Sequence, residues 1–269
     1  MQQQRHHGRG PSTLRLLALA ALTFLALVPG KDALAAALQS AKRHSPGGSP
    51  HATAQPGGAR GSSAPSGPAS SKPPLALVTT TGSDAVALTF DDGPGPYTGP
   101  LLDLLDRYHV KATFCLIGQQ VARYPDVVRR MVDDGMTLCN HTWDHDERLR
   151  TRSDDRIRDE LLRTNEAIHD VVPDAPIAYF RNPGGAFGAN TVAIARSLGM
   201  KPLMWSVDPR DWATPGTEAI IDTVLQHTHR GSVILSHDGG GVRTQTLDAY
   251  EVLLPELRGR FHLIALPVG

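Results

Sequence analysis

The chain has 269 residues, enough for one large α/β domain or two small ones, and its hydrophobic content of 40% is typical of a globular protein. Its 27 basic and 27 acidic residues give a formal net charge of +0. A chain without a basic excess lacks the charge that attracts nucleic acid or an anionic membrane surface, so we expect neither as a partner.

The first 35 residues have the layout of a secretory signal peptide. Basic residues flank an apolar run at 14–28, and a small-residue triplet at 33–35 predicts cleavage after Ala35. The alternative is an uncleaved membrane anchor, but the run is shorter than the ~20 apolar residues that a comfortable span needs. We therefore expect a secreted protein. Four basic residues and one acidic residue lie in this segment, which leaves 23 basic and 26 acidic residues beyond it.

Residues 36–74 are predicted to be a disordered linker. Ser, Pro and Gly make up 21 of these 39 residues, and no apolar periodicity runs through them. Such a segment buries too little apolar surface to offset the entropy lost on ordering. In a secreted protein it would hold the folded part away from its attachment point, for example across a cell wall, although a passive linker is the simpler interpretation.

From residue 75 to residue 269 the sequence alternates short β-rich runs with amphipathic stretches and is predicted to be one catalytic domain. The predicted strands are 86–90, 112–117, 136–140, 177–180, 202–207, 233–236 and 262–266. Six segments with helical apolar spacing follow them, the last one marked by Leu247, Tyr250, Leu254 and Leu257. This repeated order predicts an α/β fold with a parallel sheet of seven strands, closed or nearly closed into a barrel.

Side chains that can perform chemistry follow five of the seven predicted strands. They are Asp91 and Asp92, His141 and His145, Arg181, the group of Asp208, Asp211 and Trp212, and His237. Active sites of α/β proteins lie at the carboxyl ends of the strands, so the shared position of these residues is more informative than any one of them. Taken singly, each has a simpler explanation: a solvated turn for the aspartates, an exposed loop for the histidines, and structural ion pairs for Arg181 and Asp211.

The two aspartates are predicted to have different roles. Successive side chains of an extended chain point in opposite directions, so one carboxylate can bind a cation while the other accepts a proton. His141 and His145 are four residues apart and would complete a set of two imidazoles and one carboxylate. This set suits Zn²⁺, with Co²⁺ or another divalent transition metal as the alternative, and leaves positions open for water and substrate.

The remaining groups fit a proton relay for hydrolysis of an amide or an ester. His237 is the candidate acid that protonates the leaving group. A catalytic triad formed by Ser236, His237 and Asp238 is excluded, because three neighbours in sequence cannot adopt that geometry. Arg181 and Asp211 would orient the basic aspartate and the acidic histidine, respectively.

Five short motifs occur in a fixed order: TFDDGP at 89–94, HTWDH at 141–145, RNP at 181–183, DPRDW at 208–212 and LSH at 235–237. Together with KATF at 111–114 and Gly118, they resemble the motifs of the NodB-homology polysaccharide deacetylases of carbohydrate esterase family 4. The resemblance runs from about Leu75 to the carboxyl end. It implies a distorted (β/α) barrel and the metal-dependent removal of acetyl groups from sugars.

The resemblance also implies a role for each matched residue. The expected general base is Asp91, with Arg181 as its partner, and the expected metal ligands are Asp92, His141 and His145. The expected acid is His237, whose pKa Asp211 tunes. The expected walls of the acetyl pocket are Trp212 and Leu235.

One position departs from the family pattern. The family usually has an aromatic residue after Arg-x-Pro, where this chain has Gly184. The family uses the backbone N–H at this position to hold the developing oxyanion, which Gly184 retains while losing the aromatic surface. We therefore expect the departure to affect substrate binding more than catalysis.

Cys115 and Cys139 are the only cysteines and lie on neighbouring predicted strands of an exported protein. A disulfide and two free thiols are both compatible with this placement, since only some registers meet the geometric limits. A thiolate metal ligand is disfavoured because the Asp/His/His set is already complete.

The leading hypothesis is a monomeric secreted hydrolase acting on an acetylated polysaccharide or oligosaccharide: chitin-derived, peptidoglycan or acetylxylan. The sequence does not distinguish N-acetyl amides from O-acetyl esters. One alternative is a catalytically impaired carbohydrate-binding or cell-wall-associated protein on the same scaffold, supported only by Gly184. Another is a hydrolase of a non-sugar amide, which the exported amino end makes less favourable.

Overall fold

The computed structural model describes residues 75–268. The predicted signal peptide and linker lie outside the described residues. Among residues 75–268, no helix combines the length and the apolar character needed to cross a bilayer.

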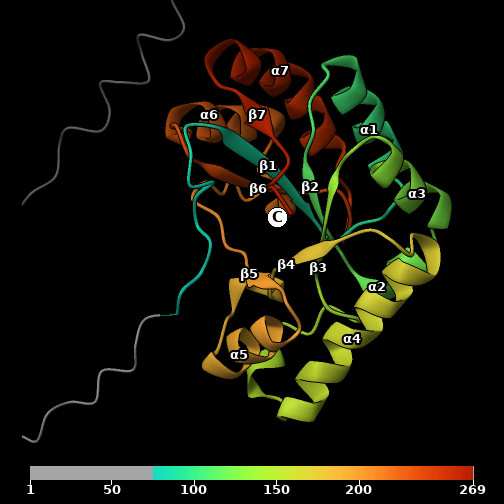
Figure 1. The fold of residues 1–269 in the computed structure, drawn as a ribbon. Helices are drawn as coiled ribbons and strands as arrows, with labels where there is room; N and C mark the ends of the chain where they lie inside the picture. Colours follow the sequence, from blue (N-terminus) through green and yellow to red (C-terminus); the bar gives the residue numbers. More distant parts are fainter. Residues whose placement is uncertain (1–74, 269) are drawn as a thin grey trace, which may run out of the picture. The chain divides into compact units, whose positions relative to one another are not determined.

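The described part is built on a parallel sheet centred on β1 (Val86–Asp91) (Figure 1). The sheet order is β5-β4-β3-β2-β1-β6, with β2 at Thr113–Leu116, β3 at Thr137–Asn140, β4 at Ile177–Phe180, β5 at Lys201–Pro202 and β6 at Val233–His237. β7 (Leu263–Ile264) pairs with the first residues of β1, whereas β2 pairs with β1 only from Thr89 onward. All seven predicted strands are present, and the expectation of a distorted (β/α) barrel is confirmed.

The fifth and seventh strands are shorter than predicted. Only Lys201 and Pro202 pair with β4. The backbone of the following residues changes partner at each step: Met204 N–H donates to the carbonyl of Val78, and Val207 forms a bridge with Ile234 of β6. The prediction of a continuous strand over 202–207 is therefore wrong, because this segment crosses from the β4 side to the β6 side. This irregular segment spans the gap between the two edges of the sheet.

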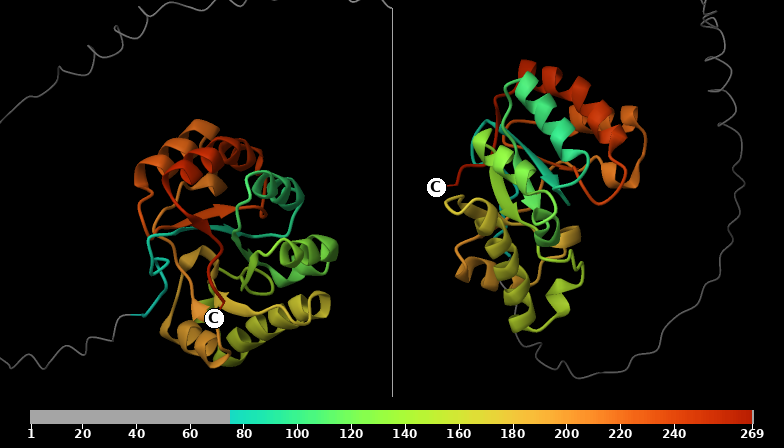
Figure 2. Two further views of the ribbon diagram at one scale, coloured as in Figure 1. Left: turned by 45° about the horizontal axis from the view of Figure 1, so that its top comes forward. Right: turned by 90° about the vertical axis from the view of Figure 1, so that its right-hand side faces the viewer.

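Helices surround the outside of the sheet, as both views of Figure 2 show. They are α1 (Thr98–Arg107), the short α2 (Gly118–Val121), α3 (Pro125–Asp133), α4 (Asp154–Val171), α5 (Ala189–Ser197), α6 (Thr217–His227) and α7 (Thr244–Arg260). The six helices predicted from apolar spacing are all present. The start of α4 shows why the chain turns helical there, because the Ser153 side chain accepts a hydrogen bond from the N–H of Arg156.

The side chains of β1 alternate between two environments. Val86, Leu88 and Phe90 belong to the large apolar core that also contains residues of α1 and α7. Ala87 belongs to a smaller cluster inside the barrel. Since successive side chains of a strand point to opposite faces, Asp91 follows Ala87 toward the barrel interior. The strand pattern therefore places a carboxylate at the mouth of the barrel.

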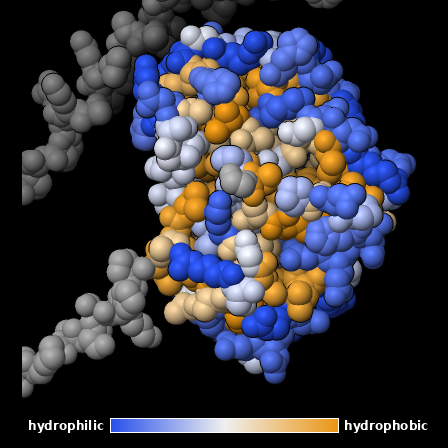
Figure 3. Space-filling view, viewed as in Figure 1, coloured by the Kyte–Doolittle hydropathy of each residue, from blue (hydrophilic) through white to orange (hydrophobic). Residues whose placement is uncertain are grey.

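Cys115 of β2 and Cys139 of β3 are register partners and form a disulfide inside the barrel. The question that the sequence left open is thus answered in favour of the disulfide. The outer surface is mixed: in Figure 3 polar side chains cover the helices at the right, and apolar side chains gather toward the middle of the view.

Candidate active site

A cleft of about 700 Å³ lies at the carboxyl ends of the strands. Its lining contains eight of the ten predicted site residues: Asp91, Asp92, His141, His145, Gly184, Trp212, Leu235 and His237. The other two, Arg181 and Asp211, are buried behind the cleft wall. The structure thus brings together residues from five separate strand ends.

Three side chains converge at the bottom of the cleft. Oδ1 of Asp92 lies 3.3 Å from Nε2 of His141 and 3.1 Å from Nε2 of His145. The three ligand atoms all lie within 4.8 Å of one another. Burial by itself raises the pKa of Asp92, but the two neighbouring imidazoles outweigh it and hold this pKa far below its usual range.

The donor set fits a divalent transition metal. Asp92 Oδ1 is buried and has no well-formed hydrogen bond within residues 75–268. Nδ1 of His141 lies 2.8 Å from the carbonyl oxygen of Arg181, so a proton on Nδ1 leaves Nε2 as a free lone pair directed at Asp92. One carboxylate oxygen and two imidazole nitrogens are a ligand set that suits Zn²⁺.

The backbone that carries the ligands is unusual. Asp92, Thr142 and His145 have φ angles of 73°, 69° and 61°, in the left-handed region that residues other than Gly rarely adopt. The two histidines therefore converge from an irregular loop and not from a helical turn. Conformations of this kind are costly and persist only where surrounding contacts hold them.

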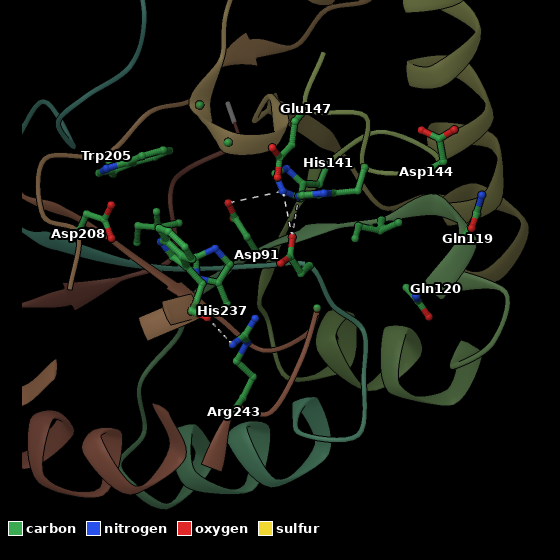
Figure 4. A pocket seen from close by; sticks show the side chains of 18 residues that line it. Asp91, Gln119, Gln120, His141, Asp144, Glu147, Trp205, Asp208, His237 and Arg243 are labelled. Atoms are coloured by element: carbon green, nitrogen blue, oxygen red, sulfur yellow. Dashed lines mark hydrogen bonds and ion pairs between the residues drawn. The ribbon is translucent and has the colours of Figure 1, made fainter. Parts of the chain in front are cut away.

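Asp91 is held by a buried arginine. Arg181 is fully buried, and its Nη1 donates to Oδ1 of Asp91 at 2.7 Å and to Oγ1 of Thr89 at 2.9 Å. Its Nη2 donates to the carbonyl of Met204 at 3.0 Å. The other carboxylate oxygen, Oδ2, lies 3.8 Å from Nε2 of His141. Asp91 is therefore fixed beside the metal ligands with one oxygen turned toward them (Figure 4).

His237 is held by a buried aspartate. Its Nδ1 lies 2.7 Å from Oδ1 of Asp211, whose Oδ2 accepts from the His237 backbone N–H at 2.9 Å and from the Thr246 hydroxyl at 2.8 Å. Burial lowers the pKa of His237, but Asp211 outweighs this effect and raises the pKa above its ordinary value. With Nδ1 engaged, Nε2 is the atom left to transfer a proton.

The upper walls of the cleft are more exposed. Leu235 is buried, while Trp212 is 48% exposed and has the guanidinium of Arg210 4.9 Å from its ring. Gly184 also lines the cleft, with a φ of 60°, and a Cβ atom there would stand 3.8 Å from Cγ of Glu147. The position that usually carries an aromatic residue thus has open space beside it but a backbone conformation that favours glycine.

Trp205, Gln119 and Gln120 also line the cleft and were not predicted from the sequence, whereas Asp208 was among the residues that follow the fifth predicted strand. Figure 4 shows Trp205 and Asp208 on one side of the cleft and Gln119 and Gln120 on the other. Trp205 lies in the irregular segment that the sequence assigned to a strand, and Gln119 is the second residue of the short helix α2. Apolar periodicity marks the buried faces of helices and strands, so it gives no signal for polar side chains or for an aromatic ring in an irregular segment.

Comparison with known proteins agrees with the geometry. Residues 79–203 match the polysaccharide deacetylase family. A chitooligosaccharide deacetylase of Rhizobium leguminosarum bv. trifolii is 39% identical over 195 residues, which are 68% of this chain and 90% of that protein. A peptidoglycan-N-acetylglucosamine deacetylase of Bacillus cereus is 38% identical over 176 residues, 64% of this chain and 81% of that protein.

A solved structure is similar along most of its length. It is a family 4 carbohydrate esterase pseudoenzyme from Bacillus anthracis, with a TM-score of 0.65 and 28% identity over 71% of this chain and 67% of that chain. The matched family, the high coverage of the relatives and the shared barrel lead to one conclusion. The chain belongs to the NodB-homology polysaccharide deacetylases of carbohydrate esterase family 4, which are hydrolases that remove acetyl groups from polysaccharides.

Proposed function

We propose that this polysaccharide deacetylase is a secreted, metal-dependent enzyme that hydrolyses the N-acetyl groups of N-acetylglucosamine oligomers or polymers. The observation that carries the proposal is the convergence of three ligand side chains beside a buried aspartate and across the cleft from a buried histidine. This arrangement separates a metal site, a base and an acid within one cleft, as metal-assisted hydrolysis requires.

Asp92, His141 and His145 would hold the metal, with Zn²⁺ as the best match to their donor atoms and Co²⁺ or another divalent transition metal as the alternative. When bound, such an ion acidifies water and polarises the acetyl carbonyl oxygen. The backbone N–H of Gly184 is the proposed additional donor to the developing oxyanion.

Asp91 and His237 would move the two protons of the reaction. Asp91 accepts a proton from the attacking water, and the hydrogen bond from Arg181 orients the carboxylate for this step. His237 donates a proton from Nε2 to the leaving sugar nitrogen, while Asp211 stabilises the imidazolium form. Cleavage of the C–N bond then yields acetate and a free amino sugar. Trp212 and Leu235 would enclose the acetyl methyl group.

The relatives favour amides over esters as the scissile bond. Two of them are named for chitooligosaccharide and for N-acetylglucosamine of peptidoglycan. The same constellation can attack an O-acetyl ester, so acetylxylan is the competing substrate. The amino-terminal sequence supports export of the enzyme. The exported part has an acidic excess, which gives no reason to expect nucleic-acid binding. We propose that the enzyme acts as a monomer.

A catalytically impaired binding protein is the second candidate. The observations that favour it are the glycine at position 184 and the similarity to a family 4 pseudoenzyme. The metal ligands, the base and the acid are nevertheless all present in this chain, and they lie in one cleft. Acetate release therefore separates the two candidates.

The test is acetate release from N-acetylated chitooligosaccharides, peptidoglycan and acetylxylan, before and after complete chelation and after addition of Zn²⁺. We expect release from at least one N-acetylated substrate, loss on chelation and recovery with Zn²⁺. Full activity after complete metal removal would overturn the metal-dependent mechanism, and absence of release from every substrate with Zn²⁺ present would favour the impaired binding protein.

A further inference from the structure

The loop that carries the two metal-ligating histidines needs support from outside. Thr142 and His145 both adopt positive φ angles, and no helix or strand fixes the backbone between them. Unless contacts over-determine this conformation, the loop will relax and move the His145 ring away from Asp92. The question is which side chains hold the loop.

Every backbone N–H group between residues 142 and 145 of this loop has a hydrogen-bond acceptor. Its four consecutive N–H groups, at 142–145, are all accepted by side-chain oxygens. The N–H of Thr142 donates to Oδ1 of Asn140 at 2.9 Å, and the N–H of His145 donates to Oγ1 of Thr142 at 3.0 Å. The two central N–H groups, those of Trp143 and Asp144, donate to one oxygen of Glu160 at 2.9 and 3.2 Å.

Glu160 is the only one of the three acceptor residues that comes from a separate element of the fold. Asn140 and Thr142 belong to the loop or its edge, whereas Glu160 projects from α4, 15 residues after His145 in the sequence. Its side chain is fully buried, and its second oxygen pairs with Nη2 of Arg156 at 2.6 Å. The same Nη2 lies 3.1 Å from Asp144, so α4 and the loop are joined by backbone and side-chain contacts.

The opposite side of the loop is held by α2. The N–H groups of Gly118 and Gln119 donate to the carbonyls of Thr142 and Trp143 at 2.9 and 3.1 Å. The loop is therefore clamped between two helices, with α2 providing donors and Glu160 providing the acceptor. One buried carboxylate oxygen satisfies two backbone N–H groups, each of which would cost free energy if it were left without an acceptor.

We propose that Glu160 is a positioning residue for the metal site, which holds the 141–145 loop in the conformation that directs His145 at Asp92. The inference rests on the proposed metal-dependent function. Without the Glu160 carboxylate, the N–H groups of Trp143 and Asp144 lose their acceptor. The backbone between Thr142 and His145, where both residues have positive φ angles, then loses two of the hydrogen bonds that stabilise its conformation. Metal affinity then falls although no ligand has been changed.

The experiment measures metal affinity on the full chain by competition with a chromophoric Zn²⁺ chelator, together with thermal unfolding of the metal-free form. Glu160→Met removes the acceptor and keeps the length of the side chain. We expect its affinity for Zn²⁺ to fall on the order of tenfold or more, as for other residues that support metal ligands indirectly. Glu166→Met, at an exposed position of the same helix, is the matched control and should retain the wild-type affinity.

Glu160→Gln distinguishes hydrogen bonding from burial. Its amide oxygen can still accept both N–H groups, so its affinity should stay within about threefold of the wild type. Glu160→Asp keeps the charge but draws the oxygens back by one methylene, and it provides the second test if Glu160→Met does not fold. A wild-type affinity in folded Glu160→Met or Glu160→Asp overturns the proposal, as does an equal loss in Glu160→Gln and Glu160→Met.

The wild-type chain and the Glu160→Met variant separate the proposed function from the proposed role of Glu160. If the wild-type chain neither binds Zn²⁺ nor depends on it for acetate release, the proposed function is wrong. If the wild-type chain binds Zn²⁺ and the folded Glu160→Met variant binds it equally well, only the role of Glu160 is wrong.

Discussion

Asp211 contacts His237 twice, once at the ring nitrogen Nδ1 and once at the backbone N–H. One carboxylate therefore fixes both the position of the residue and the orientation of its imidazole. The same contact raises the pKa of His237 against the effect of burial, with further contributions from the charges of Asp91 and Asp92.

This contact predicts the alkaline limit of activity. His237 must carry a proton to act as the acid, so kcat should fall as pH rises through its pKa. Asp211→Asn removes the charge that raises this pKa, and the alkaline limb of the kcat profile should move to lower pH. Thr246→Val removes a hydrogen bond to Asp211 but keeps the Asp211 carboxylate, so it should not move the alkaline limb to lower pH. Unchanged limbs in Asp211→Asn would show that another group sets the alkaline limit.

Exchanging one aspartate at a time tests the division of roles. Asp91→Asn should keep Zn²⁺ binding and lower kcat by about 10²–10⁴-fold, the range for loss of a general base. Asp92→Asn should lose Zn²⁺ binding. The measurements are metal content after gel filtration and the rate of acetate release at saturating Zn²⁺. Loss of metal in Asp91→Asn would mean that the two roles are reversed.

Gly184→Tyr tests the departure from the family pattern. The variant should bind metal like the wild type and change the relative kcat/KM values for several acetylated sugars, because it adds an aromatic surface to the cleft wall. The positive φ at this position should lower the unfolding free energy by about 1–2 kcal/mol. Gly184→Ala is the control that carries the backbone strain without the ring. An identical substrate profile in wild type and Gly184→Tyr would contradict the prediction.

The disulfide should contribute to stability and not to chemistry. Cys115 and Cys139 are separated by 24 residues, and closing a loop of that size stabilises a protein by ~3.5 kcal/mol on the chain-entropy model. We expect Cys115→Ala/Cys139→Ala to lower the Tm and to leave metal affinity unchanged. Reductant should lower the Tm of the wild type and have no effect on the double variant. Equal Tm values for the oxidised and reduced wild type would argue against this contribution.

The sequence predicted those parts of the structure that depend on local pattern. Apolar periodicity located the seven strands and six helices, and the rule that α/β sites lie at strand ends brought attention to Asp91, His141 and His237. Where the backbone changes partner, as between Pro202 and Val207, local pattern was misleading. An extended, apolar segment looks the same whether it pairs with one neighbour or with three.

The contacts that support the site residues could not be predicted from local sequence patterns. Glu160 lies in a helix rich in charged residues, and its only signal was its place on the apolar face, three residues after Ile157 and next to Leu161. The contact between Thr246 and Asp211 joins residues 35 positions apart. Such contacts depend on the packing of whole elements, which one sequence does not specify. The catalytic and metal-binding roles of the site residues remain predictions that the variants above can test.

The alternation along β1 has a consequence for how the enzyme can change. Its odd-numbered side chains, ending at Asp91, enter the barrel, and its even-numbered side chains, ending at Phe90, enter the helix-covered core. Deleting or inserting one residue within this strand would send the carboxylate into the apolar core and the phenyl ring into the cleft. Folding and catalysis therefore depend on the same six residues, so a shift in this strand would abolish both together.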